Sequence, residues 1–233
     1  MKIIVGNWKM NGSAAELETM ISALELVETK NKVAICVPFT MLGAKSEKLA
    51  FGAQDVSTHE KGAYTGEISA GMLADAGAKY VIVGHSERRQ HHNETNGIVR
   101  QKASQALARG LIPIICVGET MEEKESGKTM DIIAAAVSES VPADVNTDII
   151  IAYEPRWAIG AGLTPTESEI AAAHALIAKT LESMGLSGTA ILYGASVNGG
   201  NANEIMSIKN VDGVLVGGAS LKPDGFIPII TAI

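Results

Sequence analysis

The chain has 233 residues, of which 46% are hydrophobic and 19% charged, so it can bury a sizeable core. Its formal net charge is −7 and its cations are scattered, which argues against a nucleic-acid partner. The apolar stretch at residues 3–5 is too short for a signal peptide, and no apolar run reaches the length of a membrane span. We therefore expect a cytoplasmic protein that makes no membrane contact.

Short runs of apolar, often β-branched residues recur along the whole chain. They predict strands at residues 3–6, 32–37, 50–54, 80–84, 112–117, 149–152, 190–193 and 213–217. Between them lie segments with helical patterning, clearest at residues 14–29, 93–108, 129–140 and 167–183. The third strand and the short helices expected after Thr40 and Asn203 have the weakest patterns.

Apolar strands that alternate with helices indicate an α/β protein with a parallel sheet. No linker or shift in composition divides the chain, so we expect residues 1–233 to form a single (β/α)₈ TIM barrel. On the pattern alone, an open doubly wound sheet remains the alternative.

The two cysteines, Cys36 and Cys116, each lie in an apolar run and fit no zinc or redox spacing. We expect both to be reduced thiols in the core. The histidines around His85 also match no standard metal-ligand pattern, so we expect no metal. The segment 126–129 resembles the end of a phosphate-binding P-loop, but it lacks the first glycine and is interpreted as a helix start.

Polar side chains follow the predicted strands where barrel chemistry requires them. Asn7 and Lys9 follow the first strand, His85 the fourth, Glu154 the sixth and Ser196 the seventh. Gly217 and Gly218 come at the end of the eighth. Because the carboxyl ends of all strands share one face of a barrel, residues more than 200 positions apart are expected to form one pocket.

Glu154 is the first candidate for chemistry. It ends an apolar strand and precedes Pro155 and a glycine-bounded loop, residues 155–165, which we call the lid. A lone carboxylate at a strand end is usually a cap or an ion-pair partner. A loop that excludes water from it would raise its pKa and make it a stronger base.

His85 and Lys9 are the next candidates. His85 leads from a strand into a polar segment, so backbone N–H groups are expected to face its ring and disfavour the imidazolium form. Lys9 is expected on an extended segment, facing the same way as Asn7. An ammonium group there suits a phosphate or a developing oxyanion.

Glycines follow the last two strands, in Gly194-Ala195-Ser196 and in Gly217-Gly218-Ala219. Glycine allows backbone N–H groups to approach an anion closely, and loops after the last strands of a barrel commonly bind phosphate. No strand is followed by the G-x-G-x-x-G pattern, so dinucleotide binding is not indicated.

Four segments, in this order, resemble the triosephosphate isomerase family: Gly6-Asn7-Trp8-Lys9-Met10-Asn11, Gly84-His85-Ser86-Glu87-Arg88-Arg89, Ala152-Tyr153-Glu154-Pro155-Arg156-Trp157 and Val216-Gly217-Gly218-Ala219-Ser220. The resemblance runs over essentially the whole chain. It implies interconversion of dihydroxyacetone phosphate and D-glyceraldehyde 3-phosphate through an enediolate, in glycolysis and gluconeogenesis, without a cofactor.

The resemblance also implies a role for each site residue. Glu154 matches the family base, and His85 matches the neutral group that polarises the carbonyl. Asn7 and Lys9 match residues that bind substrate and stabilise negative charge, and Glu87 matches an acidic residue linked to Lys9. The residues that match the phosphate site are Gly160, Ser196, Gly217 and Gly218.

The family is usually dimeric, so the loop at residues 62–67 is expected to enter the pocket of a second copy. Two departures stand out: Arg156 occupies a position where the family usually has Val, and Ala195 replaces a Gly. Further replacements lie at residues 161 and 163–165 of the lid. Competing readings are an isomerase of a four-carbon ketose phosphate and a non-catalytic phosphate-binding barrel.

Overall fold

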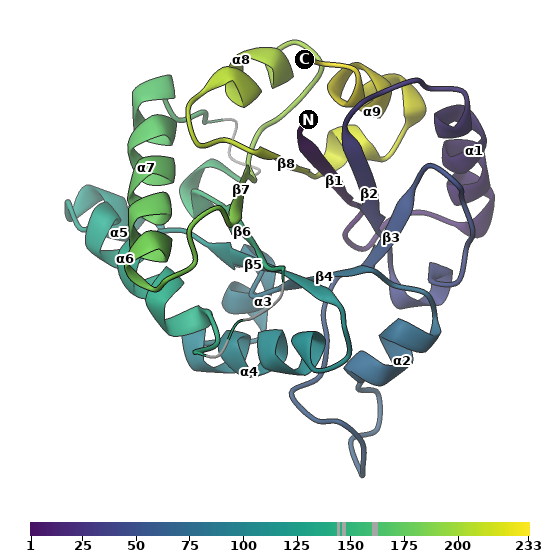
Figure 1. Cartoon of the computed structure of the whole chain (residues 1–233), viewed down its shortest axis with the longest axis horizontal. Coiled ribbons are helices and arrows are strands. Elements are labelled where there is room, and N and C mark those ends of the chain that lie inside the picture. The colour runs from purple at the N-terminus through teal and green to yellow at the C-terminus, as the bar shows by residue number, and fades with distance from the viewer. Residues whose placement is uncertain (144, 146–147, 160–162) are drawn as a thin grey trace.

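Eight parallel strands close into a barrel in the computed structural model, which describes residues 1–143, 145, 148–159 and 163–233. Each strand pairs with its neighbours in the chain, and β1 pairs with β8 to complete the ring. The (β/α)₈ prediction is therefore confirmed, and the open doubly wound alternative is wrong. Figure 1 shows the ring of strands with the helices outside it.

The strands are β1 (Ile3–Asn7), β2 (Lys32–Cys36), β3 (Ala50–Ala53), β4 (Tyr80–Val83), β5 (Ile112–Val117), β6 (Ile150–Tyr153), β7 (Ala190–Tyr193) and β8 (Gly213–Val216). The α-helices of the described residues are α1 (Ala14–Glu25), α2 (Ala70–Asp75), α3 (Ser86–His91), α4 (Asn96–Leu107), α5 (Met121–Glu125), α6 (Thr129–Ser140), α7 (Glu167–Ser183), α8 (Ala202–Ser207) and α9 (Pro223–Ile230). Three 3₁₀ turns accompany them: η1 (Phe39–Met41), η2 (Arg156–Ala158) and η3 (Gly218–Ser220).

Two helices are shorter than their patterns predicted. The helix expected from residue 93 begins at Asn96, because Thr95 accepts the N–H of Ile98 as its N-cap and Asn93 has a φ of 54°. The helix expected to reach residue 29 ends at Glu25, and Thr29 instead donates its hydroxyl to the Ile230 carbonyl. A local cap thus sets the start of α4, and a tertiary contact accompanies the early end of α1.

The segment between β2 and β3 has less helix than expected. Residues 37–49 form only the single 3₁₀ turn η1, where a short helix was predicted after Thr40. The short helix expected after Asn203 is present as α8, but it begins at Ala202, one residue before Asn203.

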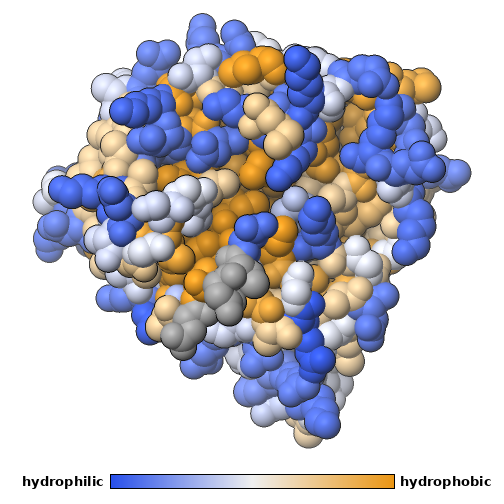
Figure 2. Space-filling model, viewed as in Figure 1, coloured by the Kyte–Doolittle hydropathy of each residue, from blue (hydrophilic) through white to orange (hydrophobic). Residues whose placement is uncertain are grey.

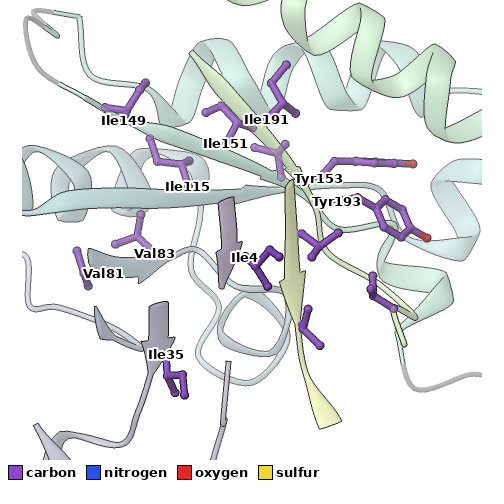
Figure 3. Packing of buried hydrophobic residues seen from close by; sticks show 14 of the residues in the cluster. Ile4, Ile35, Val81, Val83, Ile115, Ile149, Ile151, Tyr153, Ile191 and Tyr193 are labelled. Carbon is purple, nitrogen blue, oxygen red and sulfur yellow. The ribbon is translucent and has the colours of Figure 1, made fainter. Parts of the chain in front are cut away.

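The hydrophobic core has two layers because side chains alternate along each strand. One layer fills the barrel and includes Val5, Cys36, Ile114, Cys116 and Leu215. The other lies between strands and helices, and Figure 3 shows part of it. Both cysteines are buried free thiols, as predicted, and burial raises the pKa of each.

The surface is more hydrophilic than the core. In Figure 2 hydrophilic residues cover much of the outer ring, and hydrophobic residues are seen nearer the middle. No helix of the described residues is both long and apolar enough to cross a membrane.

Candidate active site

The alternation that builds the core also directs polar side chains toward the barrel mouth. Asn7 follows Val5 at an inward position of β1, and Glu154 follows Ala152 of β6 in the same way. Both side chains are buried, with exposed fractions of 5% for Asn7 and 2% for Glu154.

A cavity of about 240 Å³ gathers most of the residues that the sequence singled out. Its lining is Asn7, Lys9, His85, Glu154, Ile159, Gly194, Ala195, Ser196, Val197, Leu215, Gly217 and Gly218. These residues come from the carboxyl ends of β1, β4, β6, β7 and β8. We call this the substrate cavity. Gly160 lies outside the described residues.

His85 joins β4 to α3 and is held from both sides. Its Nδ1 accepts the backbone N–H of Glu87 at 3.2 Å, so the ring caps the helix that follows. Its Nε2 lies 3.1 Å from Oε1 of Glu154. In a neutral ring, the bond at Nδ1 requires the proton to sit on Nε2, where it is donated to the carboxylate.

The Glu154 carboxylate has a second donor, the backbone N–H of Ser86, at 2.9 Å from Oε2. Burial raises the pKa of Glu154, but the His85 ring and the Ser86 N–H lower it more, and the net direction is downward. The expectation of a raised pKa is therefore wrong for this arrangement. The carboxylate lies against hydrogen-bond donors rather than in an apolar pocket.

The pKa of His85 also departs from expectation. Burial lowers it, but the nearby Glu154 carboxylate and then Glu87 raise it, and the net direction is upward. The backbone N–H that the sequence predicted at the ring is present. The carboxylate at 3.1 Å outweighs it, because an opposite charge at this distance favours the imidazolium.

Lys9 lines the cavity and has a strained backbone conformation. Its φ is 54°, in the left-handed region, so the extended segment predicted for it is wrong. The Asn7 side chain supports this turn by accepting the Lys9 N–H at 3.0 Å. Lys9 Nζ reaches Oε1 of Glu87 at 2.5 Å, which links the end of β1 to α3.

Glu119 was missed by the sequence reasoning, although it lies two residues after the end of β5, as Glu154 lies directly after β6. It is 1% exposed and accepts a hydrogen bond from Trp157 Nε1 at 2.8 Å and another from the Tyr153 hydroxyl at 3.3 Å. Lys124 Nζ lies 3.6 Å above the Trp157 ring. Burial raises the pKa of Glu119 despite these donors. Glu119 and Lys124 thus hold the first turn of the lid.

Within the described residues, no group of three or more histidines, cysteines or carboxylates could hold a metal ion. The substrate cavity instead combines a carboxylate, an imidazole and an ammonium group around a small space. This set can exchange protons with a small molecule and stabilise negative charge on it.

Comparison with known proteins gives a consistent result. A family model described as triosephosphate isomerase matches residues 2–233. A triosephosphate isomerase of Delftia acidovorans is 48% identical, with 99% of this chain and 98% of the relative covered. One of Bradyrhizobium sp. (strain ORS 278) is 47% identical, with 97% and 96% covered. Among solved structures, triosephosphate isomerase from Bartonella henselae has a TM-score of 0.87 at 40% identity, with 98% of this chain and 97% of that chain covered.

Proposed function

The chain belongs to the triosephosphate isomerase family, and from that premise we propose a role for each polar side chain of the substrate cavity. The reaction is the family's: interconversion of dihydroxyacetone phosphate and D-glyceraldehyde 3-phosphate in glycolysis and gluconeogenesis. Glu154 is the base that moves a proton between the two carbons. His85 polarises the carbonyl, and Asn7 and Lys9 stabilise the enediolate.

The observation that carries this proposal is the contact between Glu154 and His85. The Nε2–H of a neutral His85 points at a carboxylate oxygen 3.1 Å away, and a substrate carbonyl oxygen could take that oxygen's place as acceptor. Glu154 would then turn from the ring toward the carbon that loses its proton.

Replacement of the Glu154 carboxylate by a substrate carbonyl at Nε2 would also explain how His85 can act as a neutral ring although its pKa is raised in the free protein. The Glu154 carboxylate is the main group that raises the pKa of His85, so its departure favours the neutral ring. The Glu87 N–H at Nδ1 acts in the same direction, because it requires a lone pair there. A neutral electrophile at this position is an established property of this enzyme family.

Lys9 supplies the positive charge beside the developing oxyanion. Its side chain is 28% exposed, and Glu87, itself 44% exposed, fixes its ammonium group. The positive φ of Lys9 turns the chain sharply after β1, and this bend lets the side chain reach α3. Because the strain is offset by the contacts of Asn7 and Glu87, the ammonium group is held in place before substrate binds.

Backbone N–H groups near Ser196 and Gly218 are proposed to bind the phosphate, and Gly160, outside the described residues, is proposed to assist. Among the described residues, neither Ser196 nor Gly218 donates its N–H to a protein acceptor. A Cβ at Gly218 would meet no atom within 4 Å, so the space in front of this backbone is open. An anion can approach there without displacing a side chain.

A coupled assay with D-glyceraldehyde 3-phosphate, run beside a four-carbon ketose phosphate, tests the function. The three-carbon substrate should be turned over and the four-carbon one should not. His85→Gln keeps a neutral donor but polarises the carbonyl less, and should slow the reaction by about 100-fold or more. Turnover of the four-carbon substrate in preference to the three-carbon one would favour an isomerase of a four-carbon ketose phosphate, and no turnover of either would favour a binding protein.

We also propose a homodimer built through residues 62–67. In Figure 1 the loop between β3 and α2, which contains these residues, projects away from the barrel. Tyr64 in this loop is 45% exposed, and Met10, next to Lys9, is 96% exposed. Apolar side chains this exposed, one of them beside the substrate cavity, are suited to burial by a second copy.

Deletion of residues 64–67 should therefore give a monomer with much lower activity, because the partner's loop would no longer steady Asn7 and Lys9. Sedimentation velocity at micromolar concentration would measure this. A wild-type chain that sediments as a fully active monomer would contradict the dimer. The glycolytic role of the family also supports a cytoplasmic location, which cell fractionation would test.

A further inference from the structure

Arg89 lies on α3, four residues after His85, and its side chain turns back toward the end of β4. Its Nε donates to the Gly84 carbonyl at 2.8 Å, and its Nη2 donates to the Cys116 carbonyl at 3.0 Å. Gly84 immediately precedes His85, whereas Cys116 belongs to β5. One guanidinium group therefore joins the carboxyl ends of two neighbouring strands.

The Gly84 end of this bridge determines where the His85 ring begins. Gly84 has a φ of 66°, in the left-handed region that favours glycine, and a Cβ there would lie 2.5 Å from a methyl carbon of Val99. The Gly84 carbonyl and the His85 N–H belong to the same planar peptide group. The hydrogen bond from Arg89 therefore fixes the plane from which His85 extends.

The Cys116 end of the bridge leads to Glu154. The residue after Cys116 is Val117, whose carbonyl accepts the Glu154 N–H at 2.7 Å. A guanidinium group holds its acceptors in a fixed geometry, because its N–H donors form a rigid, planar fork. The spacing between the backbones of His85 and Glu154 is thus set through Arg89 as well as through the sheet.

The guanidinium group is itself held from the other side. Its Nη1 donates to Asn96 Oδ1 at 2.7 Å, and its Nη2 lies 3.4 Å from the Ser140 hydroxyl oxygen. All of these acceptors are uncharged, and among the residues that the structure describes no carboxylate lies within 4 Å of the Arg89 guanidinium. Burial lowers the pKa of Arg89. Hydrogen bonds to neutral groups, rather than a direct ion pair, therefore offset the cost of desolvating this charge.

We propose that Arg89 is a positioning residue that keeps the His85 ring within reach of the Glu154 carboxylate. It does so by holding the carboxyl ends of β4 and β5 at a fixed spacing. Arg89 is absent from the described residues that line the substrate cavity and lines a separate cavity of about 510 Å³, so it acts without touching substrate. The inference rests on the proposed function, in which His85 and Glu154 act on the same substrate.

Arg89→Lys tests the bridge while keeping the charge, because it replaces the planar fork by an ammonium group without a rigid geometry. The His85 ring should then shift relative to Glu154. A misplacement of up to about 1 Å should lower kcat by about 10- to 100-fold. KM should change by less than about threefold, because the proposed phosphate contacts lie on other loops.

Arg100→Ala is the matched control, because it removes a similar clamp from a different place. Arg100 of α4 is exposed, and its guanidinium donates to the Glu139 carbonyl at 2.6 Å and to the Ser138 carbonyl at 3.4 Å. Neither carbonyl is next to a described residue of the substrate cavity, so this variant should keep the wild-type kcat. The urea-derived free energy of unfolding gives the folded fraction of each variant, and each rate is referred to that fraction.

Two further readouts separate positioning from a purely structural role. The first is the pKa of His85 in the free protein, measured by NMR. The Glu154 carboxylate raises this pKa, so a looser contact in Arg89→Lys should lower it. The second is chemical rescue. Because Arg89 lines a cavity, added ethylguanidinium can enter the space left in Arg89→Ala and should raise kcat at least about fivefold, whereas ethylammonium should not.

A wild-type kcat or an unshifted His85 pKa in Arg89→Lys would overturn the inference, and so would a loss of kcat as large in Arg100→Ala as in Arg89→Lys. Equal rescue of Arg89→Ala by ethylammonium would overturn it as well, because the charge rather than the fork would then be what matters. A wild-type chain without isomerase activity would instead refute the proposed function. The His85 pKa would still test positioning by Arg89 in that case, since its measurement needs no turnover.

Discussion

Shortening the Glu154 side chain by one methylene group is the sharpest perturbation of the proposed base. In Glu154→Asp the charge stays, but the carboxylate must retract by about 1.5 Å, one carbon–carbon bond. It would then lose at least one of its two contacts, with the Ser86 N–H at 2.9 Å and with His85 Nε2 at 3.1 Å.

The backbone cannot move to compensate, because it is fixed on both sides. The Glu154 N–H donates to the Val117 carbonyl at 2.7 Å, and the Glu154 carbonyl oxygen lies 1.8 Å from where a Cβ on Gly118 would be. The carboxylate therefore retracts by nearly the whole length of the bond. A misplacement of about 1 Å costs on the order of 100-fold in rate, so kcat should fall by about 100- to 1000-fold. This corresponds to about 3–4 kcal/mol of activation free energy.

The coupled assay with D-glyceraldehyde 3-phosphate measures this change. KM should change by less than about threefold, because the phosphate contacts lie on other loops. Glu182→Asp, at an exposed position of α7, makes the same chemical change away from the cavity and should leave both constants unchanged. A Glu154→Asp variant that keeps more than half of the wild-type kcat would refute the role of Glu154 as the base.

Three further predictions concern other residues. His174 is fully buried, and burial lowers its pKa from 6.5 to about 4. The unfolded chain therefore binds more protons between these values, so stability from the neutral ring is full above pH 6.5 and falls by about 3 kcal/mol toward pH 4. His174→Gln should flatten the pH dependence of the urea-derived free energy of unfolding, and an unchanged slope would contradict this. Ser196→Asp places a negative charge at the proposed phosphate site and should raise KM at least about tenfold, with Ser196→Ala as control. An unaltered KM would place the phosphate elsewhere. Gly118→Ala sets a Cβ against the Glu154 carbonyl oxygen and should lower the free energy of unfolding by about 3 kcal/mol or more. Wild-type stability of that variant would show that the two backbones are not in contact.

The barrel was predictable because its pattern is simple. Strands buried on both faces appear as continuous apolar runs, and β5 and β7 have the predicted boundaries. The helix α7 also has its predicted boundaries, because Thr166 and Glu169 form a capping box at its start. The third strand, weak in the pattern, is present as β3. Boundaries that depend on distant contacts, such as the end of α1 near Ile230, could not be predicted from a local pattern.

The residues of the candidate site were predictable from their places at strand ends, but their electrostatic state was not. The sequence indicates Glu154 as a strand-end carboxylate, yet not that its partners would be His85 and the Ser86 N–H. Those partners reverse the expected direction of both pKa shifts. Likewise, the left-handed turn at Lys9 depends on acceptors from Asn7 and Glu87, which the local sequence around a lysine does not predict.

The central claim is that Glu154 carries the proton between the two carbons of the substrate. The most direct measurement is conversion of D-glyceraldehyde 3-phosphate in D₂O, with deuterium at the new C–H bond followed by proton NMR. The wild type should form dihydroxyacetone phosphate that carries solvent deuterium. Glu154→Gln can keep the Ser86 contact but cannot accept a proton, so conversion and labelling should both fall by about 1000-fold or more. A Glu154→Gln variant that converts and labels its substrate at the wild-type rate would contradict the account.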